Sequence, residues 1–151
     1  AEGQVTATST FTMADGKHRT ALLSGFAGHT VLLVTTLDTA AVPVTDAAKM
    51  RVVHSAPDAP AMDVYLFEVG HAADSAARFV TNFQYGSGTD PQFPGYAIRP
   101  PGEYLVWLKA AGTDQVLLQA GPYTMNAGDV TSFVLSETTG GALELRAVRE
   151  Q

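Results

Sequence analysis

Short apolar or alternating runs, separated by turn-forming residues, follow one another along the chain. Residues 4–13 and 18–24 alternate loosely, and residues 30–37 form a strongly apolar run. Runs of this length bounded by Gly, Pro, Asn and Asp are typical of β-strands. By the same pattern we expect further strands at residues 50–55, 63–69, 79–85, 103–109, 115–125, 130–136 and 142–149.

The segments between these runs predict turns and loops. Residues 70–78 are long enough for one or two helical turns but too short for a stable isolated helix. Residues 86–95 predict a long irregular loop, and Gly121-Pro122 predicts an interruption of the strand at 115–125. Because 14 Gly and 8 Pro punctuate nearly every segment, the pattern indicates an all-β sandwich rather than a helical bundle.

Part of the chain repeats itself at a constant offset of 112 residues. Phe11-Thr-Met-Ala-Asp-Gly16 resembles Tyr123-Thr-Met-Asn-Ala-Gly128, and without a gap Leu22-Leu23-Ser24 matches Val134-Leu135-Ser136. Further on, Val31-Leu32-Leu33 matches Leu143-Glu144-Leu145. Each copy reads strand, turn, strand, Gly-containing loop, strand, and such self-similarity indicates a repeated structural unit.

The offset predicts how the chain divides into domains. Residues 1–37 correspond to the last third of one domain, residues 38–48 form a linker, and residues 49–151 form a complete second domain. Three strands alone would leave apolar faces and unpaired edges exposed. We therefore expect strands 1–37 to be completed by an upstream segment, by a partner chain in self-association or hetero-association, or by the second domain's own sheet edge.

A longer motif places the chain beside a known family. Met50-Arg-Val-Val-His-Ser-Ala-Pro-Asp-Ala-Pro-Ala-Met-Asp-Val-Tyr65 resembles the opening motif of the DUF4397 domain, a bacterial and archaeal family of unknown function. The resemblance continues to residue 149, and residues 1–37 resemble the family's tail. The later matching positions are Tyr85-Gly86, Pro101-Gly102-Glu103-Tyr104, Ala111-Gly112, and Tyr123-Thr124 to Gly128.

The resemblance implies an immunoglobulin-like antiparallel β-sandwich in exported or surface-anchored proteins, often as tandem copies. It therefore implies an extracellular, cell-surface or periplasmic location. The chain departs from the family pattern at residues 68–78, which are longer than usual, and at residues 87–95, which are enlarged. Because loops on a rigid scaffold commonly carry binding contacts, we expect partner contacts peculiar to this protein at these two insertions.

Composition narrows the partners. Only 16% of the residues are charged, the net charge is −6, and the nine basic residues are scattered without a cluster. Nucleic acids and anionic membrane surfaces require a concentrated basic face, so neither is expected as a partner. The chain has no Cys, and no apolar run approaches the roughly 20 residues of a membrane span. It starts at Ala1 without a signal peptide, as a mature exported product or a fragment would.

The proline-rich corner within the motif gathers the residues that carry chemistry. We interpret His54, Pro57, Asp58, Pro60 and Asp63 as a structural corner between two strands. We expect His54 to bond to backbone or to a nearby carboxylate, Asp58 to accept turn N–H groups, and Asp63 to tie the corner shut. No nucleophile motif or phosphate-binding loop occurs in the chain, so we expect no catalytic residue.

A metal-binding module centred on His54 is one alternative. Copper or zinc, as in a superoxide-dismutase-like site, would need several of His18, His29, His54 and His71 in one place, and none of these has chelating spacing. A calcium site using Asp58 and Asp63 lacks the Asp-rich spacing of known calcium loops. We therefore expect no cofactor.

A carbohydrate-binding module is the second alternative, with exposed aromatic side chains at Phe93 and Tyr96 in the 86–96 loop. The reading that the sequence favours is a non-enzymatic, exported β-sandwich module of a surface protein. It would act in structural assembly or protein–protein interaction, through surface complementarity and strand addition.

Overall fold

The computed structural model describes residues 44–85, 95–138 and 140–150, Thr10, and the backbone of residues 21–24 and 31–34. The elements are β1 (Ala21–Ser24), β2 (Val31–Val34), β3 (Ala48–Ser55), β4 (Met62–Glu68), the 3-10 turn η2 (Ser75–Ala77), β5 (Arg78–Phe83), β6 (Ala97–Arg99), β7 (Gly102–Ala110), β8 (Val116–Met125), β9 (Val130–Glu137) and β10 (Leu143–Arg149). The strand expected at 4–13 and most of the loop expected at 86–95 lie outside the described residues.

The described strands agree closely with the apolar pattern, and the exception is β6. It has three residues and pairs with β3 through Ala48, Lys49 and Met50. A strand this short shows no period, so only its pairing with β3 reveals it. The expected helical turns at 70–78 are the single 3-10 turn η2.

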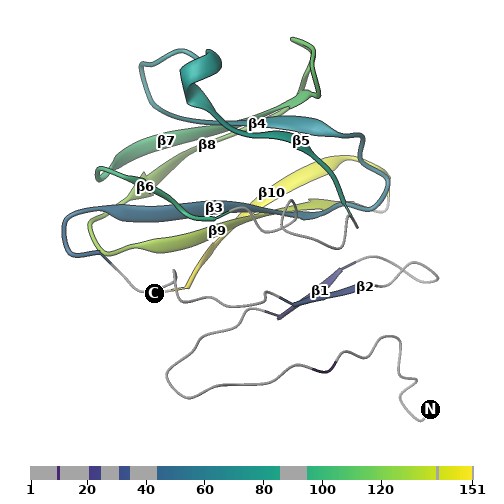
Figure 1. The fold of residues 1–151 in the computed structure, drawn as a ribbon, viewed down its shortest axis with the longest axis horizontal. Coiled ribbons are helices and arrows are strands. Elements are labelled where there is room, and N and C mark those ends of the chain that lie inside the picture. Colours follow the sequence, from purple (N-terminus) through teal and green to yellow (C-terminus); the bar gives the residue numbers. More distant parts are fainter. Residues whose placement is uncertain are drawn as a thin grey trace.

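The all-β sandwich is confirmed. One four-stranded sheet has the order β10-β9-β3-β6 and the other has the order β5-β4-β7-β8. Figure 1 shows the two sheets stacked face to face as two layers. Most neighbouring strands are antiparallel, but β3 and β9 run parallel, with Val52 opposite Phe133. The sandwich is therefore mixed at this pair, because β3 opens the domain and β9 enters the sheet from the same end.

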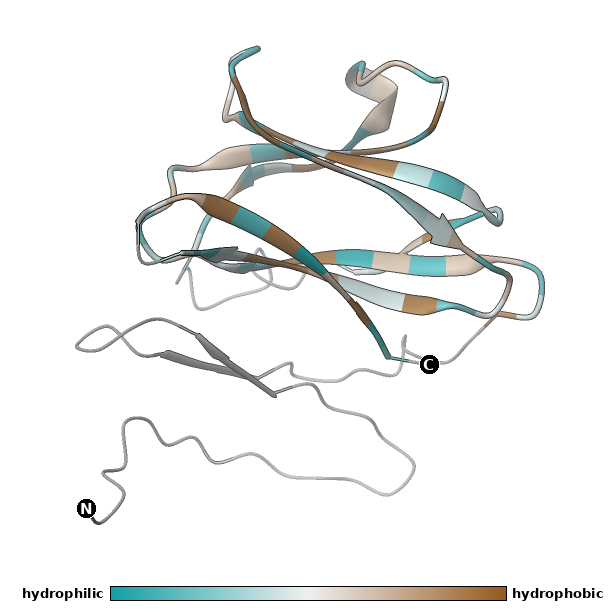
Figure 2. Ribbon diagram, turned by 180° about the vertical axis from the view of Figure 1, so that it is seen from behind, coloured by the Kyte–Doolittle hydropathy of each residue, from teal (hydrophilic) through white to brown (hydrophobic). Residues whose placement is uncertain are grey.

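The core lies between the two sheets and is filled by alternate residues of the strands. Figure 2 shows the corresponding alternation of apolar and polar bands along the strands. Burial of this apolar surface is the main force that holds the layers together. The largest fully buried apolar side chains are Phe83, Phe133, Met50, Met62, Leu108 and Leu135.

β3 is buried on both faces. Its inward residues, such as Met50 and Val52, belong to the core, while outward-facing Lys49, Arg51 and Val53 are 9%, 3% and 2% exposed. A strand covered on both faces reads as a nearly continuous buried run rather than as clean alternation. The motif strand is therefore the most enclosed strand of its sheet.

The expected break at Gly121-Pro122 is a bulge instead. β8 runs from Val116 to Met125, and its pairing with β7 shifts between Tyr104 and Val106. Gly121 has φ of 109°, and a Cβ there would stand 2.7 Å from the carbonyl oxygen of Tyr104. Because only glycine fits this close approach, the strand continues through the irregularity rather than ending at it.

β1 and β2 form a two-stranded antiparallel sheet. Among the described strands, neither of them pairs with either four-stranded sheet. No helix in the described part of the chain is long and apolar enough to cross a membrane.

Candidate functional site

His54 lies at the end of β3 and is completely buried. Its Nδ1 accepts a hydrogen bond from the backbone N–H of Ala56 at 3.3 Å, and its ring packs against Phe83 and Tyr85, with centroids 5.0 and 6.0 Å away. Burial lowers the pKa of His54 from 6.5 to about 4, so the imidazole is neutral at pH 7. Of the partners that we expected for His54, the structure shows the backbone.

The corner that follows His54 carries the chain from one sheet to the other. The N–H of Ala59 donates to the carbonyl of Ala56 at 3.3 Å, and the N–H of Asp58 donates to Oε2 of Glu137 at 2.9 Å. Pro57 is half-buried, while Pro60 and the Asp58 side chain are exposed. Asp58 therefore contributes its backbone to the corner, where we expected its carboxylate to act.

Asp63 is 4% exposed, and its hydrogen bonds leave the corner altogether. Oδ1 accepts from the N–H of Asn82 at 2.9 Å, and Oδ2 accepts from the N–H of Gly112 at 3.3 Å. Asn82 has a positive φ of 50°, where β5 is irregular, and Gly112 lies in the turn between β7 and β8. We expected Asp63 to close the corner, but it ties two other parts of the β5-β4-β7-β8 sheet to β4.

Replacing Asp63 with alanine is expected to lower the free energy of unfolding by roughly 1–3 kcal/mol, because two backbone donors lose their acceptor. Chemical denaturation of both proteins measures the difference. Asp58→Ala is the matched control, and we expect it to stay within about 0.5 kcal/mol of the parent because its carboxylate is exposed. An unchanged midpoint for Asp63→Ala would contradict the structural role.

The histidines do not gather in the part of the molecule that is described. His54 is enclosed by aromatic rings, His71 is exposed in the segment after β4, and His18 and His29 lie outside the described residues. Within residues 44–85, 95–138 and 140–150, no group of three or more His, Asp or Glu side chains is placed to hold a metal ion.

A buried polar cluster around Arg51 has no counterpart in the sequence interpretation. Nε of Arg51 donates to Oγ of Ser132 at 2.6 Å, and Nη2 pairs with Oε1 of Glu150 at 2.8 Å. The Ser132 hydroxyl also donates to Glu150, and the hydroxyl of Tyr96 donates to Oε2 of Glu150 at 2.6 Å. Burial by itself would raise the pKa of Glu150, but hydrogen bonds from Ser132 and Tyr96 and the charge of Arg51 lower it below its ordinary value.

Tyr96 belongs to this cluster. The guanidinium carbon of Arg51 lies 4.6 Å from the centre of the Tyr96 ring, which is half-buried. Its ring and its hydroxyl are both engaged, where we expected an exposed aromatic platform. Phe93, the other residue of that platform, lies outside the described residues.

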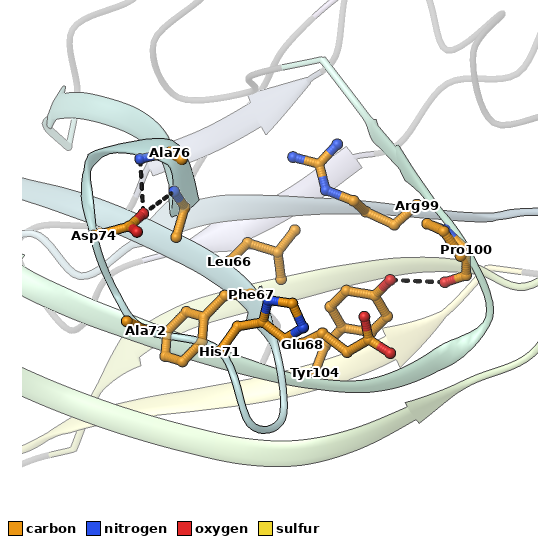
Figure 3. Close-up of a pocket in the computed structure, with 11 residues that line it drawn as sticks. Leu66, Phe67, Glu68, His71, Ala72, Asp74, Ala76, Arg99, Pro100 and Tyr104 are labelled. Carbon is orange, nitrogen blue, oxygen red and sulfur yellow. Dashed lines mark hydrogen bonds between the residues drawn. The ribbon is translucent and has the colours of Figure 1, made fainter.

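A groove of about 380 Å³ lies where β4 ends. The segment 69–77, which contains η2, forms one wall, and Arg99, Pro100 and Tyr104 form the other (Figure 3). The apolar side chains of Leu66 and Phe67 lie between the walls. This segment is one of the two insertions at which the sequence predicts partner contacts.

Backbone bonds hold the groove in shape. Oδ1 of Asp74 accepts hydrogen bonds from the N–H groups of Ala76 and Ala77 at 2.9 and 3.2 Å and so caps η2. The N–H of Val69 donates to the carbonyl of Glu103 at 2.8 Å, which anchors the start of the same wall. On the opposite wall, the hydroxyl of Tyr104 donates to the carbonyl of Pro100 at 2.8 Å. The groove is therefore suited to binding through preformed surfaces.

Comparison with known proteins bears on the N-terminal part of the chain. A search of curated proteins finds no match. Residues 1–65 match the family model described as "Domain of unknown function (DUF4397)". The matched segment contains β1, β2, β3 and the first half of β4, and so includes the corner motif. On this match, the chain belongs to the DUF4397 family.

Proposed function

We propose that the chain is a non-enzymatic, exported module for structural assembly in a cell-surface or envelope protein. In this proposal residues 49–151 form one DUF4397 copy, and residues 1–37 are the last strands of another copy. The low charge content and the absence of Cys suit such a surface module. The family resemblance supports export, and the repeat at an offset of 112 residues supports tandem copies.

One structural observation carries the proposal: the β1–β2 pair has the arrangement of the β9–β10 pair. The 112-residue offset places β1 on residues 133–136 of β9 and β2 on residues 143–146 of β10. Both pairs are antiparallel hairpins. In the first, Leu23 faces Leu32, and in the second, Leu135 faces Leu145. The registers therefore agree apart from one additional residue in the second hairpin.

The arrangement also indicates what would complete the first copy. In the second copy, β9 lies between β10 and the parallel strand β3. β1, the counterpart of β9, pairs with β2 but with no β3-like strand among the described residues. A two-stranded sheet is marginally stable at best by itself. Addition of a β3-like strand, from an upstream copy or from a partner chain, would complete it by strand pairing.

The test is to supply the missing strands. A chain carrying an extra copy of residues 38–112 in front of Ala1 contains the counterparts of the absent two-thirds of the first domain. We expect residues 1–37 of this extended chain to become as resistant to limited proteolysis as residues 49–149. The parent chain should self-associate with rising concentration in sedimentation measurements, and the extended chain should do so less.

The control carries the same extension with its residue order scrambled. Equal protection of residues 1–37 by both extensions would sink the proposal. A parent chain that is monomeric at all concentrations, with residues 1–37 already resistant to protease, would do so as well, because those strands would then be completed within their own chain.

A further inference from the structure

Two side chains of opposite charge line the groove without neutralising each other. Arg99 lies on one wall, and Glu68 lies at the end of β4 (Figure 3). In the described part of the chain, no carboxylate lies within 4.0 Å of the Arg99 guanidinium and no cation lies within that distance of Glu68. The one hydrogen bond of the Arg99 side chain, at 3.1 Å, goes to the carbonyl of Ile98.

Both charges act at the same point of the groove. Burial raises the pKa of Tyr104, the negative charge of Glu68 raises it further, and the positive charge of Arg99 lowers it. The Glu68 carboxylate also lies against the start of β7, since a Cβ on Gly102 would stand 3.1 Å from its Oε1. Arg99 and Glu68 therefore flank the Tyr104 side chain, and a ligand beside Tyr104 would meet both.

The groove is small, and its floor is apolar. Its volume of about 380 Å³ is near the lower end of the range of roughly 300–1,000 Å³ for small-molecule sites. Leu66 and Phe67 are 2% and 6% exposed, and Ala72 and Ala76 add further apolar surface on the opposite wall. These dimensions fit a ligand with an apolar body and a charged group of each sign, rather than a folded partner.

We propose that the groove binds a short zwitterionic peptide with free ends. The terminal carboxylate pairs with Arg99, the terminal ammonium pairs with Glu68, and an apolar side chain rests on Leu66 and Phe67. Opposite charges that face one groove without neutralising each other are complementary to a dipolar ligand. The guanidinium suits a carboxylate because it offers two parallel donors. The proposal rests on the groove alone and holds whether or not residues 1–37 belong to another copy.

The experiment compares capped and free dipeptides on the full chain. The probes are Ala-Leu, Leu-Ala and Ala-Phe, each free, N-acetylated, C-amidated or capped at both ends, with binding followed by NMR titration. We expect a free dipeptide to bind with a Kd in the micromolar to millimolar range. Each single cap should weaken binding at least tenfold, because one charge pair is lost, and the double cap should weaken it further.

Two variants assign the charges to the two ends. Arg99→Gln should bind the free and C-amidated forms equally, and Glu68→Gln should bind the free and N-acetylated forms equally. Arg146→Gln and Glu144→Gln remove one member each of an exposed ion pair on β10, and both should bind as the parent does. Ala76→Leu fills the groove without changing charge and should abolish binding while the protein keeps its melting temperature.

Several results would overturn the proposal. Failure of all free dipeptides to bind at 10 mM (roughly ten times the weakest expected Kd) would do so, since 1 mM corresponds to about −4 kcal/mol. Equal binding of free and doubly capped forms would show that the ends are not recognised. Unchanged binding in a folded Ala76→Leu protein would place the site elsewhere.

Discussion

Replacing Glu150 with alanine is expected to lower the free energy of unfolding by roughly 3–5 kcal/mol. The Arg51 and Glu150 side chains are 3% and 16% exposed, and their charged atoms lie 2.8 Å apart. Removing the carboxylate leaves the buried guanidinium without this counterion and takes the acceptor from Ser132 and Tyr96. Breaking a buried pair at one side costs far more than losing an exposed pair, because the desolvated charge remains.

Urea denaturation of the two proteins measures the effect. The matched control is Glu144→Ala, which removes an exposed pair in which Arg146 and Glu144 are 71% and 43% exposed. We expect that control to lie within about 0.5 kcal/mol of the parent. If Glu150→Ala unfolds at the same urea concentration as Glu144→Ala, the cluster does not stabilise the fold.

Acidification from pH 7 to pH 4 is expected to destabilise the parent protein by roughly 3 kcal/mol more than a His54→Leu variant. In the folded protein, burial lowers the pKa of His54 from 6.5 to about 4. In the unfolded chain the same imidazole takes up a proton near pH 6.5, so between the two values the unfolded state binds more protons. The contribution of neutral His54 to stability is therefore complete above about pH 6.5 and is lost as the pH falls towards 4.

The measurement is the free energy of unfolding of parent and variant at a series of pH values. Carboxylates such as Glu150 also weaken the fold in acid, and the difference between the two curves removes their share. The N–H of Ala56 loses its acceptor in the variant, which shifts the curve by a constant without changing its slope. His71→Leu is the control, because His71 is exposed. Parallel curves for the parent and His54→Leu would show that His54 is not held neutral by the fold.

The corner shows how far sequence reasoning reaches. The motif from Arg51 to Tyr65 predicts a strand, a proline turn and a second strand, and the structure has β3, a turn and β4 there. The structural use of His54 and Asp63 follows from burial and turn chemistry, but their partners do not. Asp63 bonds to Asn82 and Gly112, which are 19 and 49 residues away along the chain. A bond over that distance depends on how strands pair, and no local pattern specifies it.

The groove and the Arg51 cluster show the same limit. The sequence indicates residues 68–78 as a place for partner contacts, and that segment does form a wall of the groove. The other wall, from Arg99 to Tyr104, belongs to a different part of the chain and is brought there by the pairing of β4 with β7. Tyr96 is expected as an exposed ring from its loop position, and only the sheet places Arg51 and Glu150 against it.

The sequence alone determined the strands, the turns and the class of fold, because side-chain period and the backbone preferences of Gly and Pro are local properties. It also determined the repeat and the family resemblance, which are comparisons of residue order. The tertiary structure decided the parallel pairing of β3 with β9, the contacts of Arg51 with Ser132 and Glu150 across 81 and 99 residues, and the groove. Each of these depends on which strands lie side by side, and that choice is made by packing the whole core at once.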